Sequence, residues 1–215
     1  NLWVFESQLG WVSAFAYALT RDVVGLKRSI EQLDRLVRAG YRLEPLLEAA
    51  RGDYLRERGD TQRARQVLEA MLETLPEHHD FARQLALGAL AEAYLADAEP
   101  ERARETAERG LAIAEAPDTR LEPSRVRLAL ARALARAAEG APEQAAEELD
   151  ALLEQAATLG SPSLLGSLHE ARAHVALDAE QHETFLRHAN EALGWFRSTR
   201  NPALVARGER LTRTR

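Results

Sequence analysis

Cysteine is absent from this chain of 215 residues, so disulfide bonds, thiol nucleophiles and thiolate metal sites are excluded together. Lysine occurs once, at Lys27, and nearly all of the positive charge is therefore carried by arginine. Proline and glycine are modest in number, at 8 and 12 residues, and aromatic residues make up 6% of the chain. The lack of cysteine is compatible with a reducing compartment, and we expect a cytoplasmic protein.

A long hydrophobic run is also missing. The most apolar stretch, Leu9 to Leu19, is far shorter than the roughly 20 residues that a membrane-spanning helix needs. No Lys or Arg precedes it, so it lacks the charged start of a signal peptide. We predict that this stretch is a buried first helix and that the protein has no membrane partner. Because the chain does not begin with Met, we expect Asn1 to be an internal residue of a longer protein.

The overall composition is that of a folded protein with an acidic balance. Apolar residues make up 46% of the chain and charged residues 29%, which is enough to bury a substantial core. The formal net charge of −6 opposes non-specific binding to a phosphate backbone, because such binding needs a positive field. We therefore expect no nucleic acid among the partners.

One apolar pattern recurs five times with the spacing i, i+4 and i+7, which places its members on one helix face. Successive copies begin 38, 39, 42 and 40 residues apart. A period of this size predicts stacked helix pairs, each unable to bury its apolar face alone. Sustained apolar–polar alternation, which would indicate strands, is missing. The five copies are Leu26, Ile30 and Leu33; Ala64, Leu68 and Met71; Ala103, Ala107 and Gly110; Ala145, Leu149 and Leu152; and Phe185, Ala189 and Ala192.

Turn and capping residues divide the chain at regular intervals. Proline follows Glu44, Ser161 and Asn201, which predicts helix starts near 45, 162 and 202, with Ser161 and Asn201 as N-caps. Gly40 and Gly160 are placed to end helices in the left-handed conformation. First helices are predicted near 3–20, 44–58, 80–96, 121–138 and 162–178, second helices near 23–39, 60–75, 100–115, 142–159 and 181–198, and a capping helix over 202–213.

One predicted helix pair carries large, large, small and aromatic residues on its first helix and alanines on its second, followed by a closing proline: Leu87, Leu90, Ala91, Tyr94, Ala103, Ala107 and Pro117. This pattern resembles that of the tetratricopeptide repeat (TPR). The resemblance implies an all-α, right-handed α–α solenoid of about five helix pairs plus a C-terminal capping helix. It implies one domain over 1–215. The repeat units fall at about 1–40, 41–78, 79–118, 119–160 and 161–199, and the cap at 201–213.

The period of about 40 exceeds the 34 residues of the standard repeat, and the extra length falls in linkers and helix ends. Long-helix versions of this kind, and the closing segment over residues 195–211, resemble the C-terminal repeat regions of bacterial MalT-like regulators and multidomain Ser/Thr kinases. The resemblance implies a regulatory fragment of a larger bacterial signalling protein.

Motifs for catalysis or metal binding are not found. His169, Glu170 and His174 form H-E-x-x-x-H, one residue longer than the zinc motif, so the two imidazoles do not share a helix face. His182 and His188 are expected on the surface, and Asp80 is expected to cap the helix that follows it. The pair Glu147-Glu148 is expected on a solvated helix face. We therefore predict no enzyme, no cofactor and no metal.

The outward edge of the first helices would line the concave groove of such a repeat array. On one of them a ridge of arginines is spaced by seven and four residues, opposite an apolar face. These arginines either pair with carboxylates of the next unit or recognise a carboxylate or acidic peptide by bidentate contact. Gly88 would leave a notch beside Glu92. The predicted groove residues are Arg125, Arg132, Arg136, Glu170, His174, Asp178, Asp53, Arg56 and Glu92.

The function indicated by these features is a non-catalytic interaction or regulatory module that binds a peptide or protein segment in its groove. The segment is expected to come from another protein or from the same parent chain. Two alternatives stay open. A small-ligand sensor would need a closed apolar pocket between the aromatic N-terminal unit and its neighbour, and an assembly scaffold would self-associate through a terminal surface.

Overall fold

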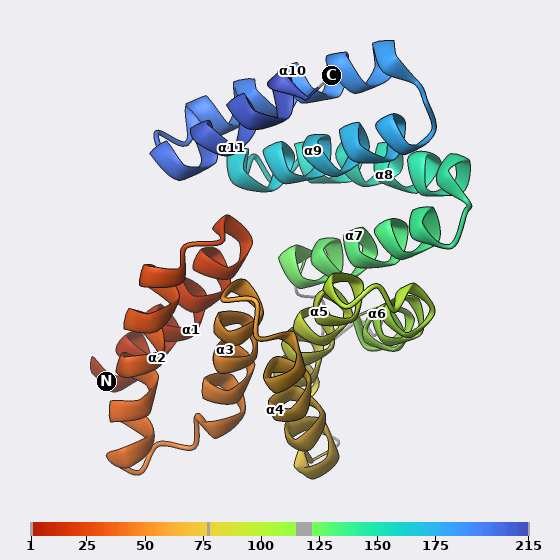
Figure 1. Cartoon of the computed structure of the whole chain (residues 1–215). Coiled ribbons are helices and arrows are strands. Elements are labelled where there is room, and N and C mark those ends of the chain that lie inside the picture. Colours follow the sequence, from red (N-terminus) through yellow and green to blue (C-terminus); the bar gives the residue numbers. More distant parts are fainter. Residues whose placement is uncertain (1, 77, 115–121, 215) are drawn as a thin grey trace. The chain divides into compact units, whose positions relative to one another are not determined.

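The computed structural model describes the backbone of residues 2–76, 78–114 and 122–214, and within these ranges the side chains from residue 10 onward, except Ala114 and Glu122. The described residues form eleven α-helices and no strand (Figure 1). Helices α1 to α6 span Leu2–Thr20, Val23–Arg38, Glu44–Glu57, Thr61–Thr74, Asp80–Ala96 and Pro100–Ala114. Helices α7 to α11 span Glu122–Ala138, Pro142–Ala157, Pro162–Asp178, His182–Ser198 and Pro202–Arg213.

Every helix predicted from the sequence is present, which confirms the all-α architecture of paired helices with a final helix. The bounds of α5 and α9 coincide with the predicted 80–96 and 162–178. Gly40 and Gly160 have φ values of +92° and +60°, so both helices before them end in the left-handed conformation as predicted. Pro117 and the predicted start of the fourth first helix at residue 121 lie outside the described residues.

Capping explains several of the helix starts. The Asp22 carboxylate accepts the N–H of Gly25 at 2.9 Å, and the Asn201 side chain accepts the N–H of Ala203 at 3.0 Å. Ser161 occupies the N-cap position of α9, but the predicted capping hydrogen bond is not formed. Its hydroxyl lies 3.4 Å from the Ser163 hydroxyl instead. Asp80 is the first helical residue of α5 and not its cap. Its negative charge therefore lies at the N-terminal, positive end of the helix dipole.

The repeated apolar positions form the core, as the periodicity predicts. Of the five repeated triplets, every member is buried except Ile30, which is half-buried and packs against the cluster of Leu26, Leu33 and Leu47. In the last pair, Phe185 and Phe196 are fully buried and pack with Leu204 and Leu211 of α11. Leu204 and Leu211 therefore cover the final pair as expected of a capping helix.

Two glycines lie where a side chain of the partner helix packs directly against the backbone. A Cβ atom at Gly52 would lie 2.5 Å from the Leu68 side chain, and one at Gly166 would lie 2.5 Å from the ring of Phe196. Real Cβ atoms do not approach other atoms this closely, so the side chains of the partner helices occupy the space above these glycines. These glycines thus set the helix spacing in the α3–α4 and α9–α10 pairs.

Contacts divide the helices into two compact units, residues 1–128 and 129–215, with the division inside α7. In unit 1, the first helices α1, α3 and α5 contact one another in order, and each also packs against the second helix that follows it. In unit 2, α8 packs against α9, α9 against α10, and α10 against α11. Within the described part of the chain, no helix has an apolar stretch long enough to cross a membrane.

Candidate interaction site

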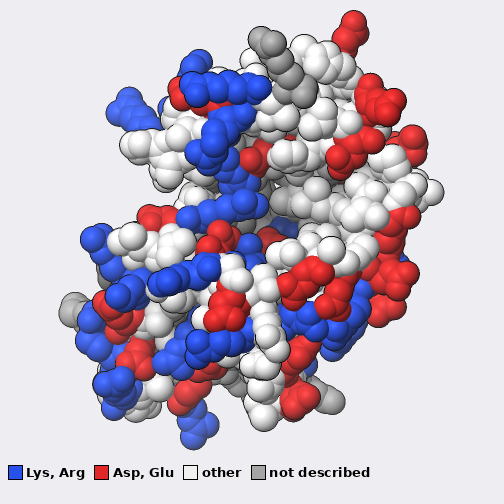
Figure 2. All heavy atoms as spheres, viewed as in Figure 1, with Lys and Arg blue, Asp and Glu red and all other residues white. Residues whose placement is uncertain are grey.

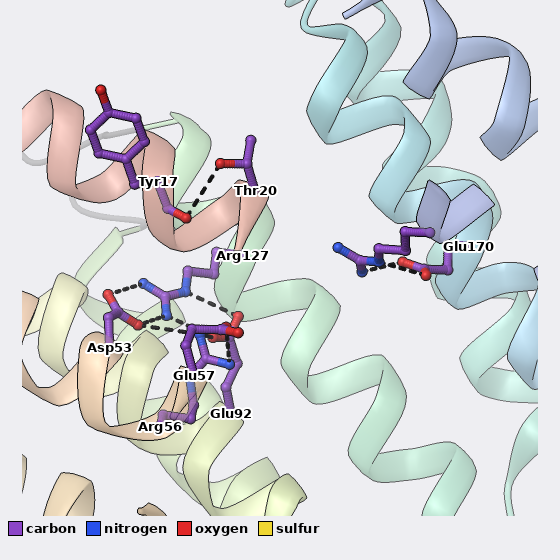
Figure 3. Close-up of polar contacts among 9 residues, drawn as sticks. Tyr17, Thr20, Asp53, Arg56, Glu57, Glu92, Arg127 and Glu170 are labelled. Atoms are coloured by element: carbon purple, nitrogen blue, oxygen red, sulfur yellow. Dashed lines mark hydrogen bonds and ion pairs between the residues drawn. The ribbon is translucent and has the colours of Figure 1, made fainter. Parts of the chain in front are cut away.

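A buried arginine joins three consecutive first helices in unit 1. Arg127 of α7 donates from Nε to Glu92 Oε1 at 3.0 Å and from Nη2 to Glu92 Oε2 at 2.6 Å. Its Nη1 donates to Asp53 Oδ2 on α3 at 3.2 Å, and its Nη2 also contacts the second oxygen of Asp53 (Figure 3). Only 2% of Arg127 is exposed. Because α3, α5 and α7 each contribute one of these three groups, the contact fixes the register of the first helices.

Arg56 completes the arrangement from α3. Its Nη2 lies 2.9 Å from Glu92 Oε2 and 3.4 Å from Asp53 Oδ1, and its Nη1 lies 2.8 Å from Glu57 Oε1. Arg56 Nε is buried and has no hydrogen-bond partner among the described residues. We refer to Asp53, Arg56, Glu57, Glu92 and Arg127 as the ion cluster. Three carboxylates and two guanidiniums leave it with a formal charge of −1.

The ion cluster favours the charged forms of Glu92 and Arg127. Burial opposes the charge on Glu92, but the guanidiniums of Arg127 and Arg56 outweigh it and lower the Glu92 pKa to about 2. Burial likewise opposes the charge on Arg127, yet Asp53 and Glu92 raise its pKa well above the usual value. Each charge is therefore stabilised by its partners, and removal of one partner would leave an uncompensated buried charge.

Gly88 and Phe15 form the packing surface around Arg127. A Cβ atom at Gly88 would lie 3.4 Å from Arg127 Cδ, so the aliphatic part of the arginine crosses the helix at this glycine. The notch predicted at Gly88 is thus filled by Arg127. The guanidinium carbon lies 6.0 Å from the centre of the Phe15 ring on α1, which brings the first helix of the first pair to the same cluster.

One hollow adjoins the ion cluster, and a second hollow continues from it. The first, which we call the aromatic pocket, has a cavity volume of about 20 Å³ and is apolar apart from Asp53. The second has a cavity volume of about 180 Å³, lies at the N-terminus of α5 and shares Leu46 with the first. Trp11 and Phe81, one from each hollow, meet edge to face at 4.6 Å. The aromatic pocket is lined by Trp11, Ala14, Phe15, Leu46, Ala49, Ala50, Asp53 and Leu85, and the second hollow by Arg42, Pro45, Leu46, His78, His79, Asp80, Phe81 and Ala82.

Three of the predicted groove residues meet in this cluster, namely Asp53, Arg56 and Glu92. The residue that joins them, Arg127, was missed. It lies two positions from Arg125 and therefore almost opposite the predicted arginine ridge, on the apolar face of α7. A single arginine on an otherwise apolar helix face is the signal that identifies such a buried ion pair.

Arg132 and Arg136 of the arginine ridge pair within their own unit and not with the carboxylates predicted from the next one. Arg132 donates from Nε to Glu148 Oε1 at 2.6 Å, and Arg136 donates from Nη1 to Glu148 Oε2 at 2.9 Å, so their carboxylate comes from α8. The side chain of Glu148 is 11% exposed, and the solvated face predicted for it is also wrong. The repeat alignment compared first helices only, whereas the α7–α8 hairpin brings Glu148 directly opposite the ridge. Arg125 is half-buried.

The predicted groove residues of α9 do not form one site: one of them is buried in an ion pair, and the other two are exposed. Glu170 is buried and accepts the Nε of Arg207 on α11 at 2.6 Å, so Arg207 does not face water as a capping helix would suggest. Figure 3 also shows the side chain of Glu170 in this ion pair. His174 and Asp178 are exposed. Charges on the face shown in Figure 2 are interspersed over the region of α1 to α4, and neither sign dominates there.

The histidines are placed differently from the prediction in one case. His188 is 6% exposed instead of lying on the surface, because α10 turns it toward His169 of α9. His182 is exposed as expected. In the described part of the chain, His, Asp and Glu side chains nowhere gather in a group of three that could hold a metal ion.

Comparison with known proteins shows the fold. No protein-family model and no curated protein matches the sequence. Among solved structures, the chain is similar to PlcR of Bacillus thuringiensis, solved with the peptide PapR7 and DNA, at 15% identity and a TM-score of 0.77 over 97% of this chain and 74% of that one. It is also similar to BtubC from P. vanneervenii, at 17% identity and a TM-score of 0.63 over 90% of this chain and 81% of that one.

A third similar structure carries the name of the repeat itself. It holds the nearly identical TPR-like repeats of a putative kinesin light chain from Podosopora anserina, at 21% identity and a TM-score of 0.57 over 91% of this chain and 97% of that one. The helical-repeat fold of this chain is therefore TPR-like, as its sequence resemblance implied. At sequence identities this low, the similarity shows the fold and does not show the function.

Proposed function

We propose that this chain is a non-catalytic TPR-type regulatory module that binds a peptide segment across α1, α3 and α5 of unit 1. The proposal rests on one observation: the aromatic pocket lies directly beside the ion cluster, and Asp53 belongs to both. A peptide bound here would pack an apolar side chain against Leu46, which lines both hollows. Its polar groups would meet Glu92, whose side chain is 24% exposed.

The dimensions of both hollows argue against a whole small molecule. Sites for small ligands usually enclose about 300–1,000 Å³ and bury most of the ligand, whereas the cavity volume is about 20 Å³ in the aromatic pocket and about 180 Å³ in the neighbouring hollow. The neighbouring hollow continues the same surface through Leu46. An extended segment that uses both hollows fits this geometry better than a compact ligand does, which ranks the small-ligand sensor second.

The similarity to PlcR adds support of a different kind. The PlcR structure was solved in complex with a peptide and DNA, so a chain of similar fold binds a peptide. For the present chain the net charge of −6 opposes DNA contact, and we propose a protein or peptide partner without nucleic acid. An origin in a bacterial signalling protein and a cytoplasmic location complete the proposal.

Selection of a random dodecapeptide display library on the immobilised full chain tests this function. Selected peptides are synthesised, and their Kd is measured for the wild type and for Leu46→Lys, which places a charge in both hollows. We expect a shared apolar residue among the selected peptides and a loss of affinity of about tenfold or more for the variant.

The matched control is Leu186→Lys, the same change at a residue of α10 that is 40% exposed. It should leave the Kd unchanged. Equal weakening by both variants, or selected peptides without a shared apolar residue, would overturn the proposed site. Light scattering of the free chain addresses the scaffold alternative, since self-association at micromolar concentration would favour it over peptide binding.

A further inference from the structure

Two imidazoles face each other in unit 2, between helices α9 and α10. His169 Nδ1 and His188 Nδ1 are 3.0 Å apart, and the ring centres are 5.2 Å apart. His188 is buried, so water does not separate the rings from that side. The distance is that of a hydrogen bond, which requires one of the two nitrogens to carry a proton and the other to accept it.

Arg187 decides which nitrogen carries the proton. Its Nη2 lies 3.3 Å from His188 Nε2, and because a guanidinium only donates, His188 Nε2 must accept. The single proton of neutral His188 is then on Nδ1, where it is donated to His169 Nδ1. The proton of neutral His169 is consequently on Nε2. This arrangement satisfies both contacts only when both rings are neutral.

A second proton on either ring breaks this arrangement. On His188 the proton would be added at Nε2, against the N–H of Arg187. On His169 it would be added at Nδ1, against the Nδ1–H of His188. On His188 the two opposed donors belong to Arg187 and His188, so the Arg187 contact is lost. On His169 they belong to the two rings, so the contact between α9 and α10 is lost.

Charged groups from three helices surround the pair. Burial is the largest cause that lowers the pKa of His188 to about 4, followed by the neighbouring His169 and by Arg172 of α9 and Arg187 of α10. Asp150 on α8 acts in the opposite direction. The Asp150 carboxylate is itself held by Arg172, through a bond of 3.0 Å from Nε.

His169 is held neutral for a similar reason. Burial is the largest cause that lowers its pKa, and Arg187 acts in the same direction. Glu191 of α10 and Asp150 act against them without reversing the shift. A net preference for the neutral form at both rings follows from the groups that face them.

We propose that the His169–His188 contact is a proton-sensitive latch between α9 and α10, closed at neutral pH and released on acidification. Since the folded protein disfavours the protonated rings, the unfolded chain binds more protons below the ordinary histidine pKa of about 6.5. The stability that the latch contributes is complete above that pH and declines as the pH falls toward 4. The device is separate from the peptide site of unit 1.

The test compares the folding equilibrium by urea unfolding at pH 7.5 and pH 5.0. For the wild type we expect the folding constant to fall by about tenfold as the pH is lowered. The double variant His169→Gln, His188→Gln should lack most of this loss, whatever its stability at pH 7.5. His174→Gln, which replaces an exposed histidine of the same helix, should retain the loss of the wild type.

A second measurement needs no variant. Nitrogen-15 NMR of the full wild-type chain at pH 7.5 should show His188 in the Nδ1–H tautomer and His169 in the Nε2–H tautomer. Both rings in the Nε2–H tautomer, titration of His188 above pH 6, or an equal pH dependence in the double variant would each overturn the latch.

Discussion

At the residue scale, Arg127 is the side chain on which unit 1 depends most. It is almost fully buried, it contacts carboxylates from α3 and α5, and its own helix is α7. A buried charge of this kind is stabilised only by its partners, because the transfer of the guanidinium from water is costly. The value of the contact lies in the register it imposes on three helices.

We expect Arg127→Met to lower the free energy of unfolding by about 3–5 kcal/mol, since Asp53 would lose its main partner within the buried cluster. Arg127→Lys keeps the charge but not the fork of donors, and it should give an intermediate loss. Urea unfolding monitored by circular dichroism measures both. Arg63→Met, at a side chain that is 72% exposed, should change stability by less than about 1 kcal/mol. An unchanged free energy of unfolding in Arg127→Met would contradict this, because it would show that apolar packing can replace the ion cluster without loss of stability.

Glu92 gives the ion cluster a signature in acid. Its pKa in the folded protein is about 2, below its ordinary value, because Arg127 and Arg56 outweigh the effect of burial. The stability it contributes is complete above pH 4.5 and is lost as the pH falls toward 2. We expect Glu92→Gln to flatten the decline of stability in this window, and Glu101→Gln, at an exposed position of α6, to leave it as in the wild type. An unchanged slope in Glu92→Gln would contradict the role assigned to the cluster.

At the element scale, helix existence and pairing follow from local sequence, whereas partners across helices do not. Each helix could be predicted from three features of the sequence. These are the period of about 40 residues, the prolines after Glu44, Ser161 and Asn201, and the left-handed glycines. Glu148 shows the limit, because the alignment of repeats says nothing about the second helix that faces the arginine ridge. Arg127 shows the same limit. From the sequence alone it is a charged residue on an apolar helix face, and only the structure shows that two carboxylates from other helices pair with it.

The arginine ridge of α7 illustrates the same point and can be tested. Because Glu148 pairs with both Arg132 and Arg136, charge reversal of the two arginines should lower the thermal stability of the chain. The affinity for a selected peptide should be unchanged, because the proposed site is on α1, α3 and α5. Loss of affinity without loss of stability would return the ridge to the binding surface.

Close contacts at glycine within a pair make a second prediction for the elements. Gly166→Ala should destabilise the chain by about 1–3 kcal/mol, because the added methyl group would meet the Phe196 ring. Gly194→Ala, within α10, meets no atom within 4 Å and should instead stabilise the helix by up to about 1 kcal/mol. Thermal unfolding of the two variants measures the difference. Equal effects would mean that glycine does not set the helix spacing.

At the scale of the whole molecule, the chain combines a helical-repeat fold with features that differ between its two units. Unit 1 holds the ion cluster and two adjoining hollows, and unit 2 holds the histidine pair. The repeated residues explain the fold, whereas the residues that break the repeat, such as Arg127 and His188, form the sites proposed for binding and for response to pH. The prediction of one domain over 1–215 remains a prediction.

Hydrogen–deuterium exchange of the full chain, with and without a peptide selected from the dodecapeptide library, tests the central claim most directly. Binding across the aromatic pocket should slow exchange in α1, α3 and α5, around Trp11 to Phe15, Leu46 to Asp53 and Leu85 to Glu92. Exchange in α10 and α11 should be unchanged. Protection confined to unit 2, or no protection at a saturating peptide concentration, would contradict the claim that unit 1 carries the binding site.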